Sequence, residues 1–165
     1  MQHSPLRLAP ALFTATILLA SCAQTPAAKA PQPPAAPEPP PAMTMGNGAA
    51  NWIITDGATR NGSTFTFPEV QIDGPGWLVM HPFENGKPNG DIYVGASYLA
   101  DGSHSAVDIE INREASAGDM FIVMLHSDVD QDQNFDFVFV GNTGQVEDKA
   151  VFEGSKMIGQ AYRSP

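Results

Sequence analysis

The stretch AVDIEIN, residues 106–112, alternates apolar and polar side chains along its whole length. Val107, Ile109 and Ile111 share one face, and the acidic and amide side chains between them share the other. In a β-strand, successive side chains point to opposite faces. The stretch therefore predicts a half-buried strand, with one face in a core and one face in water.

A second stretch, DMFIVMLH at residues 119–126, is apolar on both faces, which indicates a strand at the centre of a sheet. Other strand-like segments recur along the chain, separated by Gly, Asn, Asp and Pro. These segments are 51–55, 64–72, 77–81, 91–98, 135–140 and 156–162. Pro68 has no N–H for a ladder, so we expect segment 64–72 to lie at a sheet edge or to bulge there.

Segment 91–98 places Ile92, Val94, Ala96 and Tyr98 on one face. No stretch beyond the N-terminal region shows a helical period of useful length. Seven or eight short strands with turn residues between them predict an all-β fold, an antiparallel sandwich of two sheets. A small barrel is the alternative.

The N-terminus has the features of a lipoprotein signal peptide. Arg7 precedes an apolar run over 8–20, which is too short to span a membrane as a helix. The run ends in Leu-Ala-Ser-Cys, and the cysteine is Cys22. This pattern resembles the bacterial lipobox, so we expect residues 1–21 to be removed and Cys22 to be acylated. Several acyl chains on one residue give stable membrane anchoring.

Residues 22–50 are predicted to be the lipidated cysteine and a linker, and 51–165 to be the β-sandwich domain. Residues 23–42 contain eight prolines and are otherwise mostly alanine, which favours an extended polyproline stalk. A proline-rich ligand for a partner protein is the other interpretation. Ala23, rather than aspartate, follows the cysteine, which favours the outer membrane over the inner one.

Composition excludes several kinds of chemistry. Cys22 is the single cysteine, so its acylation leaves no thiol for a disulfide, a thiolate nucleophile or a blue-copper site. The formal net charge is −10, which disfavours binding to nucleic acid and favours attraction of cations. The P-loop, the H-E-x-x-H motif, the nucleophile elbow and the dinucleotide fingerprint are all missing from the sequence, so we expect no enzyme.

A series of motifs resembles a known domain. PGWLVMH at 75–81 is followed by a glycine-rich hairpin, then by MFIVMLHSD at 120–128 and NFDFV at 134–138. In this order they resemble a domain of unknown function found in archaeal and bacterial surface proteins. The resemblance covers residues 51–162 and implies a secreted, β-rich, Ig-like domain, but it implies no activity. The longer acidic stretch before Phe135 departs from the pattern of the family.

That acidic stretch, SDVDQDQNFDF at 127–137, places an oxygen-bearing side chain at every second position. The candidate ligands are Asp128, Asp130, Asp132, Asn134 and Asp136. Ca²⁺ accepts six to eight oxygen ligands in irregular geometry, so a calcium loop between strands is one interpretation. A turn with its carboxylates spread into water is the other, and it is the more common arrangement. An EF-hand is excluded, because Gln133 and Phe139 replace its glycine and its last glutamate.

Histidines and aromatic residues offer weaker candidates. His81 and His126 each end an apolar strand, and His104 lies between them in sequence. No close pair such as HxH is present, so we expect backbone hydrogen bonds for these rings rather than a transition-metal site. Trp77 is expected to fill the core, and Tyr93 is the better candidate for an exposed aromatic contact.

These observations predict a lipid-anchored protein of the cell envelope. Its domain would act as a non-catalytic structural or interaction module with an envelope protein or glycan as partner. The alternative is a binding protein for a small ligand, a glycan or a metal. A pocket lined by the two strand-end histidines would favour the alternative.

Overall fold

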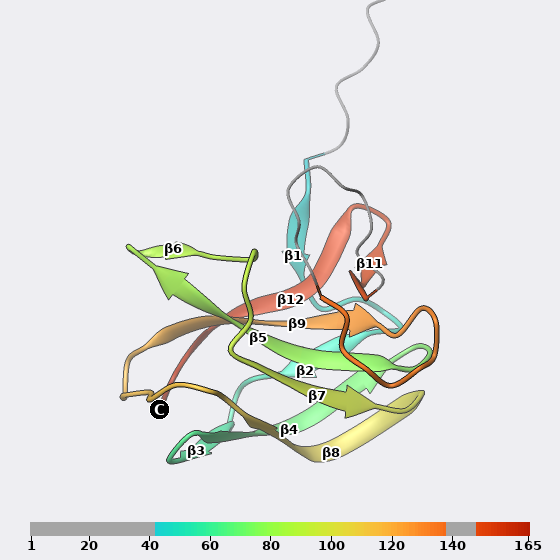
Figure 1. The fold of residues 1–165 in the computed structure, drawn as a ribbon. Coiled ribbons are helices and arrows are strands. Elements are labelled where there is room, and N and C mark those ends of the chain that lie inside the picture. The colour runs from blue at the N-terminus through green and yellow to red at the C-terminus, as the bar shows by residue number, and fades with distance from the viewer. Residues whose placement is uncertain (1–41, 138–147) are drawn as a thin grey trace, which may run out of the picture. The chain divides into compact units, whose positions relative to one another are not determined.

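The computed structural model describes residues 42–137 and 148–165 and arranges them as two β-sheets (Figure 1). None of these residues forms a helix, so this part of the chain contains no helix that could cross a membrane. The two sheets confirm the all-β sandwich predicted from the alternating segments. The predicted signal peptide and Cys22 lie outside the described residues.

The larger sheet has the order β1-β12-β9-β5, with β6 and β7 both on the far side of β5. Its main strands are β5 (Gly76–Glu84), β9 (Met120–Ser127) and β12 (Lys156–Arg163). The short strands of this sheet are β1 (Thr44–Gly46), β6 (Lys87–Pro88), β7 (Gly95–Leu99), β10 (Lys149–Ala150) and β11 (Phe152–Glu153). β1 comes from the segment predicted to be linker, and it pairs with β12 in parallel.

The smaller sheet is built around β4 (Thr64–Ile72). β8 (Gly102–Glu110) pairs along one side of β4, while β2 (Trp52–Ile54) and β3 (Thr59–Asn61) share the other side. β4 is therefore a central strand, and Pro68 is tolerated because the ladder is interrupted there. The pairs on either side are Phe67 with Val107 and Glu69 with Ser105. Ala106, opposite Pro68, has a left-handed backbone with φ of 52°.

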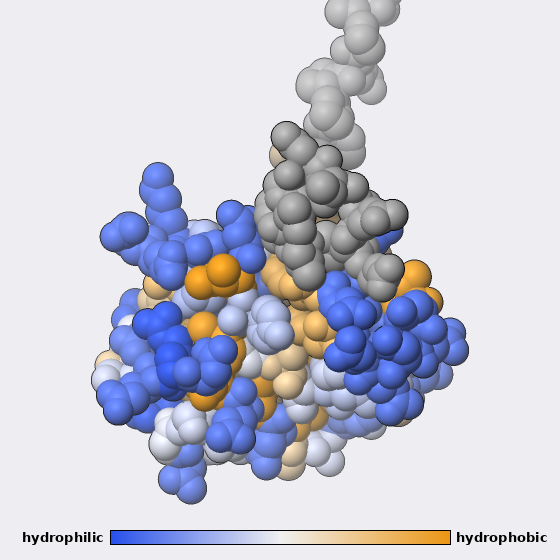
Figure 2. Space-filling view, in the orientation of Figure 1, coloured by the Kyte–Doolittle hydropathy of each residue, from blue (hydrophilic) through white to orange (hydrophobic). Residues whose placement is uncertain are grey.

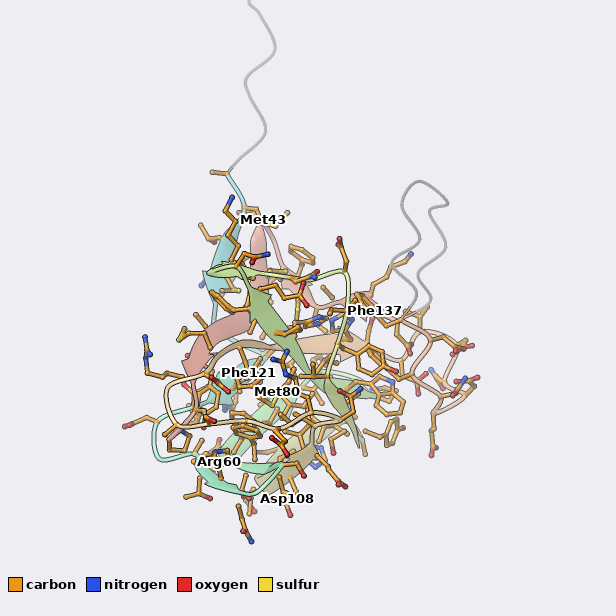
Figure 3. The ribbon with its side chains drawn as sticks, turned by 60° about the vertical axis from the view of Figure 1, so that its left-hand side comes forward. Met43, Arg60, Met80, Asp108, Phe121 and Phe137 are labelled. Atoms are coloured by element: carbon orange, nitrogen blue, oxygen red, sulfur yellow. The ribbon has the colours of Figure 1, made fainter. Side chains whose placement is uncertain are left out.

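The core lies between the two sheets and follows the predicted alternation. Val107, Ile109 and Ile111 are buried, whereas the polar residues between them are exposed. Phe65 of β4 meets Phe121 of β9 edge-on, with ring centroids 5.5 Å apart. Figure 3 shows Phe121 in the interior of the sandwich. Aromatic contacts of this kind add to the stabilisation from apolar burial.

Two predicted strands differ from the structure. The strand at 91–98 begins later, as β7, so Ile92 stays 43% exposed and only the second half of the segment joins the ladder. Tyr98 packs against Trp77 rather than facing the core with Val94. These residues alternate as a strand would, but the turn after β6 delays their entry into the sheet.

The segment 135–140 was predicted to be a strand, but its described part, residues 135–137, forms no strand, and 138–140 lie outside the described residues. Phe135 and Phe137 instead stack on each other and pack edge-on or tilted against aromatic side chains on the outer face of the larger sheet. Phe135 contacts Trp77, and Phe137 contacts His81. The apolar alternation therefore reflects burial against side chains instead of ladder pairing.

Candidate metal centre

The acidic loop begins where β9 ends and returns to the sheet at β10. β10 is antiparallel to β9, and Lys149 pairs with Ser127. The next residues outward from this pair are Asp128 and Asp148. The strand register therefore places the two carboxylates at the base of the loop, although 20 positions separate them in the chain. Figure 2 shows hydrophilic surface at the end of the sandwich where this loop lies in Figure 1.

The carboxylates of the loop converge into two overlapping groups. Oxygens of Asp128, Asp130 and Asp148 lie within 4.8 Å of one another, and so do oxygens of Asp130, Asp132 and Asp136. Asp130 belongs to both groups. All four predicted aspartates are thus brought together, and the structure adds Asp148 as a fifth.

Asn134, the remaining predicted ligand, supports the cluster by hydrogen bonds. Its backbone N–H donates to Asp132 Oδ1 at 2.7 Å, and its side-chain amide donates to Asp136 Oδ1 at 2.9 Å. Gln131 and Gln133 have left-handed backbones with φ of 61° and 60°. These turns bend the loop so that the alternate carboxylates can approach one another.

The two carboxylates at the base are buried and only half satisfied. Asp128 is 3% exposed and Asp148 is 0% exposed. One oxygen of each accepts a backbone hydrogen bond, from Gln133 at 3.3 Å and from Asp136 at 2.8 Å. Oδ1 of Asp128 and Oδ1 of Asp148 have no hydrogen-bond partner among the described residues. Burying a polar oxygen without a partner is unfavourable, and a bound cation is one group that would satisfy both atoms.

The electrostatics of Asp148 agree with this view. Burial raises the pKa of its carboxyl group, and the negative charges of Asp128 and Asp130 raise it further, while backbone hydrogen bonds from Asp136 and Val129 act in the opposite direction. A bound cation would reverse the balance, because it favours the ionised form of every carboxylate around it.

A second feature lies beside this loop, on the outer face of the larger sheet. His81 and His126 are each 1% exposed, and their Nε2 atoms lie 3.4 Å apart. Nδ1 of His81 donates to the carbonyl of Ile92 at 2.7 Å, and Nδ1 of His126 donates to the carbonyl of Asp148 at 2.9 Å. The predicted backbone hydrogen bonds are confirmed, as they are for half-buried His104, which donates to the carbonyl of Ala100.

Both buried histidines border a cavity of about 300 Å³. Its lining is formed by His81, Gly90, Ile122, Met124, His126, Phe137, Lys149, Ala150 and Met157. Burial lowers the pKa of His81, and it lowers the pKa of His126 to about 4, with the neighbouring His81 contributing to the second shift. Both rings are therefore neutral at neutral pH.

The aromatic candidates are part of the same outer surface. Trp77 is 8% exposed and is buried, as predicted, but under Tyr98 and Phe135 instead of between the sheets. Tyr93 is 38% exposed and packs edge-on against Phe135 at 4.9 Å. Tyr93 therefore covers part of the aromatic layer and still offers a partly exposed ring.

Asp148 and the pairing of the two histidines were missed in the sequence analysis. Asp148 stands alone in sequence, and only its position directly before β10 connects it to the loop. The sequence predicted both rings at strand ends, but His81 lies inside β5, which continues to Glu84, and only His126 lies next to the end of its strand. The contact between them depends on how β5 pairs with β9.

Comparison with known protein families bears out the resemblance seen in the motifs. The model of the family described as Domain of unknown function (DUF7282) matches residues 51–162. No curated protein and no solved structure matches the chain significantly. The match brings no activity with it, so function must be argued from the residues themselves. Since the match covers more than half of the chain, this protein belongs to the family described as Domain of unknown function (DUF7282).

Proposed function

We propose that this protein is a lipid-anchored component of the cell envelope whose β-sandwich acts as a non-catalytic structural or interaction module stabilised by Ca²⁺. Acylated Cys22 would hold it in the membrane, with the outer membrane favoured, and the proline-rich segment would carry the domain away from the lipid surface. Its partner would be an envelope protein or a glycan, since the negative charge disfavours nucleic acid.

The Oδ1 atoms of Asp128 and Asp148, which accept no hydrogen bond from the described residues, carry the calcium part of the proposal. Two buried carboxylate oxygens without a hydrogen-bond donor are expensive to maintain, and a cation between them would satisfy both. Asp130, Asp132 and Asp136 add further carboxylates within reach. Together with backbone oxygens and water, these groups can supply the six to eight oxygens that Ca²⁺ takes.

The acidic cluster favours Ca²⁺ over Mg²⁺. Mg²⁺ requires nearly octahedral geometry and keeps several waters, so it is usually held by one or two carboxylates. The loop offers five carboxylates on an irregular backbone, which suits the larger and less directional ion. By joining β9 to β10, calcium would hold the aromatic layer of Phe135 and Phe137 against the sheet.

The cavity beside His81 and His126 supports a second candidate function, a binding protein for a small ligand or a metal. Phe137, Ile122 and two methionines give it a mainly apolar lining, and the two imidazole rings that border it have their Nε2 atoms 3.4 Å apart. Ligand pockets combine an apolar lining with a few convergent polar atoms in this way. The two candidates are compatible, because the calcium loop and the cavity use different side chains.

Thermal unfolding of the chain from Ala23 onward, with Ca²⁺, Mg²⁺ or a chelator, tests the calcium proposal. A ligand that binds only the folded state adds about 2.7 kcal/mol at a hundredfold excess over its dissociation constant. We expect Ca²⁺ to raise the midpoint by several degrees, with a smaller effect of Mg²⁺. Asp148→Asn should abolish the calcium shift, whereas Asp56→Asn, an exposed acid outside the loop, should retain it. A midpoint that is the same in calcium and chelator would show that the loop is a solvated turn.

The membrane anchor is tested separately with the full chain expressed in a bacterium. The chain with Cys22 intact should fractionate with membranes and incorporate labelled fatty acid. Cys22→Ser should lose the label, because the acylated thiol is removed. Equal labelling of both chains would contradict the anchor.

A further inference from the structure

The tautomers of the two buried histidines follow from their backbone contacts. A carbonyl oxygen only accepts hydrogen bonds, so Nδ1 of His81 and Nδ1 of His126 each carry the ring proton. In a neutral ring the other nitrogen then has an unshared lone pair. Both Nε2 atoms are in this state, and they face each other across 3.4 Å in a buried site.

Two lone pairs at this distance need a positive centre between or beside them. An added proton is one solution, but burial disfavours a charged imidazolium at both positions. A metal ion is the other. Two imidazole nitrogens bound to one ion at about 2.0–2.1 Å, with a tetrahedral angle, lie roughly 3.4 Å apart. The observed separation matches this value, whereas a linear two-coordinate ion would hold the nitrogens about 4 Å apart.

The orientation of both rings also fits metal binding. Histidine ligands usually donate the N–H of the other ring nitrogen to a carbonyl or carboxylate, which fixes the ring and increases its basicity. The carbonyls of Ile92 and Asp148 provide such contacts here. His81 and His126 lie on the same face of β5 and β9, and the pair Val79–Met124 lies between them in the register.

The remaining donors that line the cavity are soft and neutral. Met124 and Met157 both border it, and the described part of its lining contains no carboxylate. Thioethers favour Cu(I) over harder divalent ions, and imidazole is a common copper ligand. Lys149 also borders the cavity, and its positive charge opposes a divalent ion more than a monovalent one.

We propose that His81 and His126, with the thioethers of Met124 and Met157, form a Cu(I) site on the outer face of the larger sheet. The separation of the two nitrogens requires at least one further ligand beside them, and both methionines border the same cavity. This site does not depend on calcium. Asp148 lies next to both sites, because its carbonyl orients His126 while its carboxylate belongs to the acidic loop.

The proposal is tested by anaerobic titration. The chain from Ala23 onward is mixed with Cu(I), which is supplied as its coloured bicinchoninate complex. This chain keeps every residue that the structure describes and lacks the thiol of Cys22. We expect the protein to remove one equivalent of Cu(I) from the chelator. X-ray absorption should then show two nitrogen and one or two sulfur ligands. Failure to take Cu(I) from the chelator, or a spectrum without sulfur, would overturn the proposal.

Matched variants identify the ligands. His81→Asn and His126→Asn keep a donor near the Nδ1 position and remove Nε2, so each should weaken Cu(I) binding tenfold or more. Met124→Leu combined with Met157→Leu conserves volume and should also weaken it. His104→Asn, at a half-buried ring outside the cavity, should bind as the unchanged chain does. Equal binding by the His104 and His126 variants would place the copper elsewhere.

Two further measurements test the Cu(I) site without relying on variants that fail to fold, and separate it from the calcium loop. If the histidine variants do not fold, the unchanged chain can be tested instead by ¹⁵N NMR. The metal is then Ag(I), a diamagnetic substitute for Cu(I). Nε2 of both rings should shift, and unshifted Nε2 signals would contradict the site. Asp130→Asn combined with Asp132→Asn should reduce calcium binding and leave Cu(I) binding intact. Loss of both ions in this variant would contradict two separate sites.

Discussion

Acidification should destabilise the metal-free domain through His126. Burial, with a smaller contribution from His81, lowers the pKa of this ring from 6.5 to about 4 in the folded state, although its bond to the carbonyl of Asp148 acts in the opposite direction. The unfolded chain therefore binds more protons between these two pH values. Stability from the neutral ring is complete above pH 6.5 and is lost as the pH falls towards 4.

The gap between the two pKa values gives the size of the effect. At about 1.4 kcal/mol for each pH unit, it corresponds to a loss of about 3 kcal/mol in the free energy of unfolding. Below the folded pKa the loss from this group stops increasing, because both states are then protonated. The pKa of His81 is lowered in the same direction, so its contribution adds to the slope.

Urea unfolding from pH 7 to pH 4, in the presence of a chelator, measures this loss. His126→Asn removes the titrating ring and keeps a donor near the carbonyl of Asp148. Between pH 7 and pH 4 this variant should therefore lose about 3 kcal/mol less unfolding free energy than the unchanged chain. His104→Asn is the control and should retain the slope of the unchanged chain. If His126→Asn does not fold, NMR titration of His126 in the unchanged chain should give a midpoint near 4. Equal slopes for the His126 and His104 variants, or a His126 midpoint near 6.5, would refute the assignment of a buried neutral ring.

Two packing predictions concern the unfolding free energy in urea. Phe65→Ala should lower the unfolding free energy by about 3–5 kcal/mol, because the ring is fully buried. Phe152→Ala, at a ring that is 45% exposed, should lower it much less. Similar losses in the two variants would contradict the assigned core. Gly76→Ala should strongly destabilise the domain or prevent its folding, because a Cβ at this position would overlap the carbonyl oxygen of His126. Gly90→Ala should be tolerated, because a Cβ there meets open space. A stable Gly76→Ala protein would show that β5 and β9 are farther apart than described.

The strands could be predicted where side-chain alternation reports burial directly. The strand at 119–126 matches β9, and the strand predicted at 106–112 overlaps β8, which begins four residues earlier and ends two residues earlier. The first segment has no solvent-exposed face in its pattern and the second has one. The same signal was misleading at Phe135 and Phe137. Their alternation reflects packing on the outside of a sheet, and the pattern of a single segment does not show whether its backbone joins a ladder.

The candidate sites were also predictable from the sequence only in part. The spacing of Asp128, Asp130, Asp132 and Asp136 was visible in sequence, because residues two apart in a short loop can turn towards one ion. It left open whether they converge or spread into water. The return of the chain through β10 brings Asp148 next to the loop and buries it with Asp128, where one oxygen of each accepts no hydrogen bond from the part of the chain that the structure describes.

By itself, the sequence determined the all-β class, most of the strands and the faces that their side chains occupy. These properties depend on local periodicity, which the order of residues contains directly. Only the tertiary structure decided that His81 and His126 share a cavity and that Asp148 joins the acidic loop. Both contacts link residues 20 or more positions apart, and they depend on the register in which β9 pairs with β5 and β10. Register is a property of two strands together, so neither strand's own sequence pattern could reveal it.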